Sequence, residues 1–203
     1  MKRFVFLFAS VLLPISLLSA QDVCGSHEGH DYVDLGLSVK WATCNVGATT
    51  PSDYGDYFAW GETSPKEEYD EDNSKTQGKG MGNIAGNPQY DVARAKWGGS
   101  WRMPTKAELE ELKEKCEWTW TSTDGINGYR VTSKTNGNSI FLPAAGWRYG
   151  KFGKKVGEEG YYRSSTPYEI NTYCAYDLTF HSANQSVNWN FRDCGYTIRP
   201  VTE

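Results

Sequence analysis

The sequence predicts an α+β domain, because two short helix signals stand in a chain that is otherwise strand-like. The clearer signal begins at Thr105, whose spacing to Glu108 is that of a capping box. In this motif two side chains bond the backbone amides that a helix start leaves free. Leu109, Leu112 and Cys116 then recur at i, i+3 and i+7, so one side of the expected helix is apolar.

A second, shorter helix is expected just before the first. Asp91 can cap its first turn, residues 92–97 would form it, and Gly98 is placed to end it. A corner rich in Trp and Gly then leads into the capped helix. Trp101 from this corner, and Trp147 further along the chain, are expected in the core.

The rest of the chain has the pattern of strands, turns and loops. Asn136-Gly137, between strand-like residues 129–133 and 139–142, is the strongest hairpin signal in the sequence. Further strands are expected at residues 39–42, 57–60, 161–165, 175–180, 186–190 and 196–201.

The first twenty residues have the pattern of a signal peptide. Lys2 and Arg3 precede an apolar run over residues 4–18, and small residues end at Ala20. We expect cleavage after Ala20 and a mature chain that starts at Gln21 and is secreted, periplasmic or cell-surface associated. An uncleaved anchor is the weaker alternative, because the run is shorter than the ~20 residues of a membrane span. No membrane span is expected after cleavage.

The mature chain has the size of one domain. We expect a flexible segment at residues 21–31 and a single domain over residues 32–203. The whole chain has a formal net charge of −4, and loss of the two basic residues of the signal makes it −6. This acidic balance argues against nucleic-acid binding, which depends on neutralising phosphates. The 8 Trp and 13 Tyr residues can serve a core, but they also suit a recognition surface.

Five cysteines in an exported chain indicate disulfides with one residue left over. We expect a bond between Cys44, which follows an apolar run, and Cys116. Cys174 and Cys194 flank the last expected strand pair and form the second predicted bond. Cys24 precedes the first strand and is the odd residue.

No metal or cofactor is expected, because clustered ligands such as paired C-x-x-C are absent. His27 and His30 lie in the segment expected to be flexible, where solvent exposure is the better interpretation. Residues 63–89 are expected to be a long surface loop. Its acidic cluster at residues 66–72 could hold calcium, but it lacks the Asp-x-Asp-x-Asp-Gly pattern, so a solvated loop is favoured.

Six motifs occur in a familiar order. They are residues 32–37 (YVDLGL), 41–48 (WATCNVGA), 54–62 (YGDYFAWGE), 97–105 (WGGSWRMPT), 141–146 (FLPAAG) and 199–201 (RPV). In this order they resemble the Fibrobacter succinogenes major paralogous domain, a family common in exported proteins of Bacteroidetes-type gut bacteria. That family resembles members of the C-type-lectin-like superfamily. The formylglycine-generating enzymes and the variable proteins of diversity-generating retroelements are other members of this superfamily. The resemblance implies a C-type-lectin-like fold with two helices, mixed or antiparallel sheets and long irregular loops.

One position departs from the family pattern. Members usually have Tyr-Trp-Ser-Ser where this chain has Tyr162-Arg163-Ser164-Ser165. If the position faces the interior, Arg163 must snorkel or find a partner. If it faces outward, the change alters a surface. The sequence leaves both alternatives open.

Enzyme activity is not expected. Formylglycine-generating relatives act through a closely spaced cysteine pair, whereas Cys174 and Cys194 are twenty positions apart. A Ser-His-Asp arrangement that uses His181 lacks a Gly-x-Ser-x-Gly elbow. Glu158 and Glu159 are adjacent in a loop and do not have the opposed placement of glycosidase carboxylates.

Calcium-dependent sugar binding of the lectin type is a minority alternative. Residues 187–191 (VNWNF) lack the Asp of the lectin Trp-Asn-Asp strand, and the chain has neither Glu-Pro-Asn nor Gln-Pro-Asp. Trp189 is therefore interpreted as a core or sheet-face aromatic.

The favoured function is non-catalytic recognition or adhesion through an extracellular glycan or protein ligand. Residues 161–190 are rich in Tyr, Asn, Ser and Thr, the residues of adaptable binding loops. The runner-up is a structural or assembly component of a surface appendage, and polar strand faces without a partner would explain the same composition. The candidate contact residues are Tyr168, Asn171, Tyr173, Asn184, Gln185 and Asn188.

Overall fold

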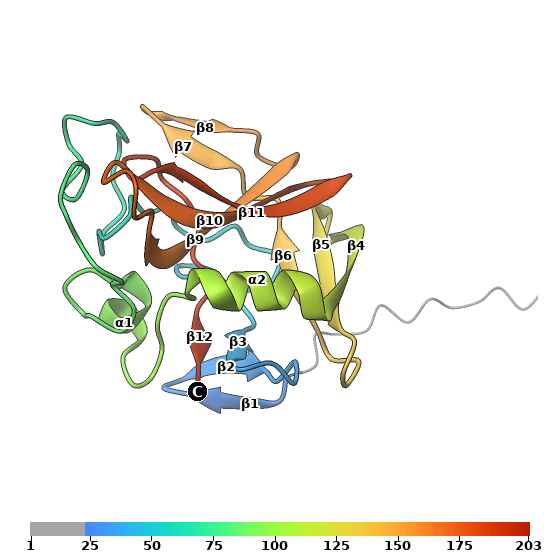
Figure 1. The fold of residues 1–203 in the computed structure, drawn as a ribbon. Helices are drawn as coiled ribbons and strands as arrows, with labels where there is room; N and C mark the ends of the chain where they lie inside the picture. The colour runs from blue at the N-terminus through green and yellow to red at the C-terminus, as the bar shows by residue number, and fades with distance from the viewer. Residues whose placement is uncertain (1–22) are drawn as a thin grey trace, which may run out of the picture.

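The computed structural model describes residues 23–203, so the predicted signal peptide and cleavage site lie outside the described residues. The fold is α+β, with two helices and four small sheets (Figure 1). The helices are α1 (Val92–Trp97) and α2 (Lys106–Lys115). The first sheet, in the order β1-β2-β3-β12, contains Gly25–His27, His30–Val33, Lys40–Ala42 and Val201–Thr202. The second, β11-β10-β9, contains Asn184–Phe191, Cys174–His181 and Glu159–Pro167. The third, β4-β5-β6, contains Cys116–Thr123, Ile126–Ser133 and Ser139–Pro143, and the fourth pairs β7 (Trp147–Tyr149) with β8 (Phe152–Lys154).

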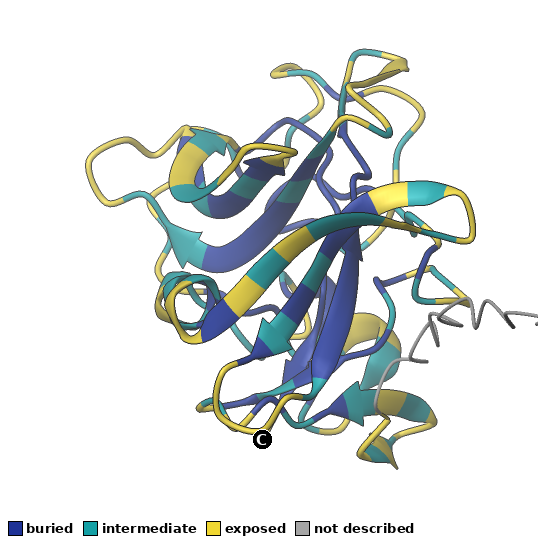
Figure 2. Cartoon of the chain, turned by 90° about the vertical axis from the view of Figure 1, so that its right-hand side faces the viewer, coloured by how far each residue is buried: buried dark blue, intermediate teal, exposed yellow. Residues whose placement is uncertain are grey.

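The sheet β9-β10-β11 lies at the centre of the molecule (Figure 1). Helix α2 packs against all three of its strands, and the β7–β8 hairpin lies on the other side. Leu109 and Leu112 of α2 meet Leu178 and Phe180 of β10 in the largest apolar cluster. Figure 2 shows buried residues gathered inside, with exposed residues concentrated in the loops. None of the helices described within residues 23–203 is long and apolar enough to cross a membrane.

Both helix starts are confirmed. The Asp91 side chain accepts hydrogen bonds from the backbone N–H of Ala93 at 2.9 Å and of Arg94 at 3.1 Å. Gly98 follows α1 with φ +72°, a conformation that glycine adopts without steric cost. At α2, Thr105 and Glu108 form both halves of the capping box.

The end of α2 differs from the prediction. Cys116 is the first residue of β4, and its side chain is buried against the same core as the apolar side of α2. The strand β4 was not expected, because the helical spacing of Leu109, Leu112 and Cys116 predicted a helix that includes Cys116. Cys116 is instead the first residue of β4.

The Asn136-Gly137 hairpin is confirmed, since it joins β5 to β6 in an antiparallel pair. Two other expected strands are mostly irregular. Residues 57–60 contribute a single bridge from Phe58 to Tyr196, and residues 196–201 reach a regular strand only at Val201.

The segment expected to be flexible is ordered from Gly25. It forms the β1–β2 hairpin, in which His27 and His30 are opposite each other. The ring of His30 stacks on Trp97 with centroids 3.8 Å apart, and the His27 Nε2 accepts the backbone N–H of Ser100 at 3.0 Å. These contacts with the helical corner explain why the prediction was wrong.

A buried arginine joins distant parts of the chain. Arg199 donates from Nη1 to the carbonyl oxygens of Ala42, at 3.0 Å, and Thr43, and from Nη2 to that of Phe141 at 2.9 Å. Its Nε donates to Asn45 Oδ1 at 2.8 Å. The fixed fork of guanidinium donors thus joins the end of β3 and the loop after it to β6.

The predicted disulfides are not formed. Cys116 is buried in the core beside α2, whereas Cys44 lies half-exposed in the loop after β3, next to Thr43. Cys174 begins β10 opposite Phe191, so Cys194 falls beyond the end of the strand pair. Both predicted pairings are therefore wrong in this structure.

Candidate functional site

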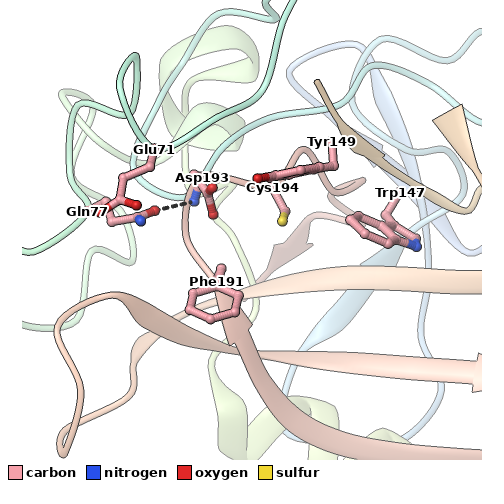
Figure 3. Close-up of a pocket in the computed structure, with 7 residues that line it drawn as sticks. All are labelled: Glu71, Gln77, Trp147, Tyr149, Phe191, Asp193 and Cys194. Carbon is pink, nitrogen blue, oxygen red and sulfur yellow. Dashed lines mark hydrogen bonds between the residues drawn. The ribbon is translucent and has the colours of Figure 1, made fainter. Parts of the chain in front are cut away.

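An aromatic cleft of about 310 Å³ opens where three distant segments meet (Figure 3). The long loop, strand β7, and the end of β11 with the residues that follow it each supply part of its lining. The lining residues are Glu71, Gln77, Trp147, Tyr149, Phe191, Asp193 and Cys194. We refer to this site as the aromatic cleft.

One wall of the aromatic cleft consists of three rings that solvent can reach. Tyr149 is 51% exposed and Phe191 is 53% exposed, which is unusual for large apolar side chains. Trp147 is half-buried, and its ring centroid lies 6.3 Å from that of Tyr149 and 6.1 Å from that of Tyr161. The expectation that Trp147 lies in the core is thus wrong, whereas Trp101 is fully buried as expected.

The facing wall is polar. Asp193 is 5% exposed, and its Oδ1 has no hydrogen-bond partner among the described residues. Its backbone N–H donates to Gln77 Oε1 at 3.1 Å, which links the long loop to the segment after β11 (Figure 3). Glu71 adds an exposed carboxylate from the same loop. An unpaired buried oxygen is costly, so this carboxylate is a strained feature of the polar wall.

Arg192 holds the two walls together. Its side chain is buried, and its Nη1 donates to the carbonyl oxygens of Thr76 at 3.2 Å and Lys79 at 2.9 Å. Its Nε donates to the carbonyl oxygen of Cys174 at 2.9 Å, and its guanidinium lies 4.1 Å from the ring centroid of Trp60. The long loop, expected to be a solvated segment, is therefore fixed to β10 at this point.

The thiol in the aromatic cleft is not activated. Burial, with a smaller contribution from the charge of Asp193, raises the pKa of Cys194 to about 12. Burial also raises the pKa of Cys174. Both residues are therefore protonated near neutral pH, and a thiol nucleophile requires the thiolate. In the described part of the chain, no three His, Cys, Asp or Glu residues gather into a possible metal site.

Arg163 belongs to β9, in the same sheet as Phe191, and its side chain is buried in the interior. Its guanidinium sits 3.8 Å from the ring centroid of Tyr196, and Nη2 donates to the carbonyl oxygen of Phe191 at 2.7 Å. Further bonds from Arg163 reach the carbonyl oxygens of Ala175, Asn190 and Cys194. Arg163 has therefore found partners inside the fold, and it supports the backbone on both sides of the aromatic cleft.

Asp177 is buried beside Arg163, directly across the β9–β10 pair. The Asn190 side-chain amide donates to both of its carboxyl oxygens, at 3.1 and 3.0 Å. Burial raises the pKa of Asp177 to about 6, although the charge of Arg163 and the bonds from Asn190 and Thr179 oppose the shift.

The predicted contact residues fall into two groups at opposite ends of the β10–β11 hairpin. The first group lies in the loop between β9 and β10, where Tyr168 stacks on Trp189 with centroids 4.9 Å apart and planes at 6°. Of the second group, Asn184 pairs with His181 beside the tight turn and Gln185 follows it. Asn188 lies between the groups and lines a shallow hollow with Tyr161. The first group is Tyr168, Asn171 and Tyr173, the second is Asn184 and Gln185, and Asn188 belongs to neither.

The residues of the aromatic cleft were not predicted from the sequence. Phe191 and Trp189 alternate with asparagines in β11, so their side chains share one strand face, but alternation alone does not reveal exposure. Trp189 is 48% exposed on this face. It is therefore a sheet-face aromatic, which is one of the two interpretations that the sequence allowed.

The residues weighed for catalysis lie elsewhere. His181 and Glu159 are opposite each other in the β9–β10 pair, and both line a second shallow hollow with Glu158 and Ser182. His181 is exposed, and its Nδ1 accepts the backbone N–H of Ala183 at 3.3 Å. This bond occupies one ring nitrogen with a local turn.

A family model described as a domain of unknown function, DUF8237, matches residues 114–201. The matched region runs from the end of α2 to β12 and contains five of the seven residues that line the aromatic cleft. No curated protein and no solved structure matches the chain.

Proposed function

We propose that this protein is an exported, non-catalytic recognition module that binds an extracellular ligand in the aromatic cleft. The observation that carries the proposal is the set of solvent-accessible rings of Trp147, Tyr149 and Phe191, which line one cleft together with Asp193. Ligand sites combine apolar and aromatic walls with a small number of placed polar groups, and the aromatic cleft has this composition.

Among extracellular ligands, a glycan fits this chemistry better than a protein segment. The C–H face of a sugar ring packs on an aromatic side chain, while its hydroxyls donate to carboxylate and amide oxygens. Glu71 and Gln77 supply polar groups at the rim, and Asp193 adds a carboxylate that is almost fully buried in the wall. At about 310 Å³, the cleft has the volume of a site for one or two sugar rings.

Export and family membership are part of the proposal. The basic and apolar pattern of residues 1–20 supports cleavage after Ala20 and a secreted, periplasmic or surface location. The ordered motifs support membership of the major paralogous domain family and a C-type-lectin-like fold. The two helices, small sheets and long anchored loops are compatible with that fold. Intact mass of protein from the native host tests export, since it should correspond to a chain that starts at Gln21.

Non-catalytic binding is supported by the state of the two cysteines. The formylglycine-generating enzymes need a reactive thiol pair, whereas Cys174 and Cys194 are separate and have raised pKa values. Cleavage or oxidation of an array-bound ligand by the purified protein would contradict this part of the proposal.

The binding test uses an array of immobilised mucin-type and plant-type oligosaccharides, followed by calorimetry with the best oligosaccharide. Trp147→Ala and Tyr149→Ala should each weaken binding at least tenfold, as expected when aromatic anchors are removed. Phe152→Ala is the matched control, because Phe152 is a 70% exposed aromatic on β8 that does not line the aromatic cleft. It should bind like the wild type.

A second pair of variants tests the surface that the sequence favoured. If Tyr168→Ala and Tyr173→Ala abolish binding while Trp147→Ala does not, the ligand binds at the β9–β10 loop and the proposed site is wrong. Absence of binding to every oligosaccharide, combined with capture of a host glycoprotein after deglycosylation, would replace the glycan by a protein ligand.

A further inference from the structure

The strand β11 is a long, open edge of the central sheet. It is eight residues long, and all eight pair with β10. In the sheet order β11-β10-β9 it has no neighbour on its outer side within the described residues. Every second residue of an edge strand directs its backbone N–H and C=O away from the sheet, where they can pair with another strand.

The opposite edge of the same sheet is covered. Tyr162 of β9 forms a bridge with Thr197, and Gly160 forms one with Gly146. The β9–β10 pairing also has a register shift near Ala175. The pairing of β10 with β11 runs without a shift from Cys174 to His181. The two edges therefore differ, and only β11 presents a regular ladder to solvent.

The sequence of β11 contains none of the features that protect edge strands. Residues 184–191 (NQSVNWNF) include no Lys, Arg, Asp, Glu or Pro. Natural edge strands are usually protected by a charge, a proline or a bulge. In a chain with a net charge of −4, this uncharged strand can approach its own copy without like-charge repulsion. Self-association also requires a surface that is complementary to itself, and an antiparallel pair of identical strands satisfies this condition.

We propose that β11 pairs in antiparallel register with β11 of a second copy of this chain, about a two-fold axis at Asn188. This register keeps the two faces of the pleat continuous, because positions of the same parity then face each other. Trp189 lies opposite Val187 of the second copy, and Asn188 lies opposite its own counterpart. Trp189 is 48% exposed in the single chain, and the pairing covers part of its ring.

The pairing extends the central sheet from three strands to six and places two aromatic clefts on one particle. Two linked sites bind a repetitive ligand with greater avidity than one site. The same register sets Gln185 of the second copy opposite Phe191, at the edge of the aromatic cleft. Gln185, one of the predicted contact residues, thus lies beside the aromatic cleft of the other copy.

The register is tested by cross-linking. Asn188→Cys is made together with Cys24→Ser, because Cys24 is an exposed cysteine that would give other cross-links. Opposed positions in antiparallel strands have Cα atoms about 4.5–5.5 Å apart, within disulfide range. Mild oxidation should convert most of the Asn188→Cys chain into a covalent dimer. Gln185→Cys in the same background is the control. In this register the two introduced cysteines lie six positions out of alignment, roughly 20 Å apart, and should not cross-link.

The interface itself is tested by sedimentation of the full mature chain with Asn188→Lys. Asn188 is exposed, so the thermal melt should stay close to that of the wild type, whereas two like charges at the axis should weaken dimerisation at least tenfold. A wild-type chain that remains monomeric at several hundred micromolar would overturn the proposal. A dimer unaffected by Asn188→Lys, or equal cross-linking at positions 185 and 188, would also overturn it.

Discussion

The stability of this fold should depend on pH in part through the buried carboxyl group of Asp177. Asp177 is completely buried, and burial raises its pKa to about 6. In the unfolded chain an aspartate has a pKa of about 3.9. Between these values the folded state holds a proton that the unfolded state has released. The folded form is therefore favoured most at low pH and loses this advantage as the pH rises from about 4 to about 6.

The magnitude follows from the difference between the two pKa values. A difference of about two units corresponds to about 3 kcal/mol, since each unit is worth about 1.4 kcal/mol. Asp177→Asn keeps the shape of the side chain but cannot ionise. The free energy of unfolding of Asp177→Asn, relative to that of the wild type, should rise by up to about 3 kcal/mol between pH 4 and pH 7.

The assay is urea unfolding of wild type and Asp177→Asn at pH 4, 5, 6 and 7. Asp72→Asn is the control, because Asp72 is an exposed aspartate in the long loop and its replacement should leave the pH dependence of the wild type unchanged. Parallel pH profiles for wild type and Asp177→Asn would refute the reasoning, because they would mean that the carboxyl titrates alike in both states.

Three further outcomes are expected. Trp101→Ala should lower the free energy of unfolding by about 3–5 kcal/mol, because the ring is fully buried. Trp147→Ala should lower it by clearly less, because the Trp147 ring is half-buried in the aromatic cleft. Equal losses of stability in chemical denaturation would contradict this difference. Thr105→Ala should cost about 1 kcal/mol by removing the acceptor at the start of α2, and an unchanged urea midpoint would count against the capping box. Alkylation in guanidinium without reductant should modify all four cysteines of the two predicted bonds, and a protected pair in the peptide map would show that a disulfide exists after all. These thiols are Cys44, Cys116, Cys174 and Cys194.

Features whose partners are close in the sequence could be predicted. The capping box of Thr105 and Glu108 is complete within four residues, and the hairpin at Asn136-Gly137 depends on its own turn conformation. Asp91 was recognised as a cap for the same reason, although its Oδ2 also accepts the backbone N–H of Met103 at 2.9 Å, which the sequence did not reveal.

Features that depend on distant partners were missed. The β1–β2 hairpin looked like a flexible segment, because the ring that holds His30 belongs to Trp97. The cysteine pairing failed because sequence spacing does not report whether two thiols face each other. The aromatic cleft combines three segments, from Glu71 to Cys194, so no local pattern marks it.

The placement of β12 governs when this protein can finish folding. Val201 pairs with Trp41 and also bridges to Arg102, and Arg199 bonds the carbonyl of Ala42 over a separation of 157 residues. Until residues 199–202 have been synthesised, the first sheet lacks a strand and the loops after β3 lack their hydrogen-bond donors. Contacts of such long sequence separation form slowly, because a large loop must close first. A chain built this way stays incomplete until these residues have been synthesised, which is compatible with the export proposed above.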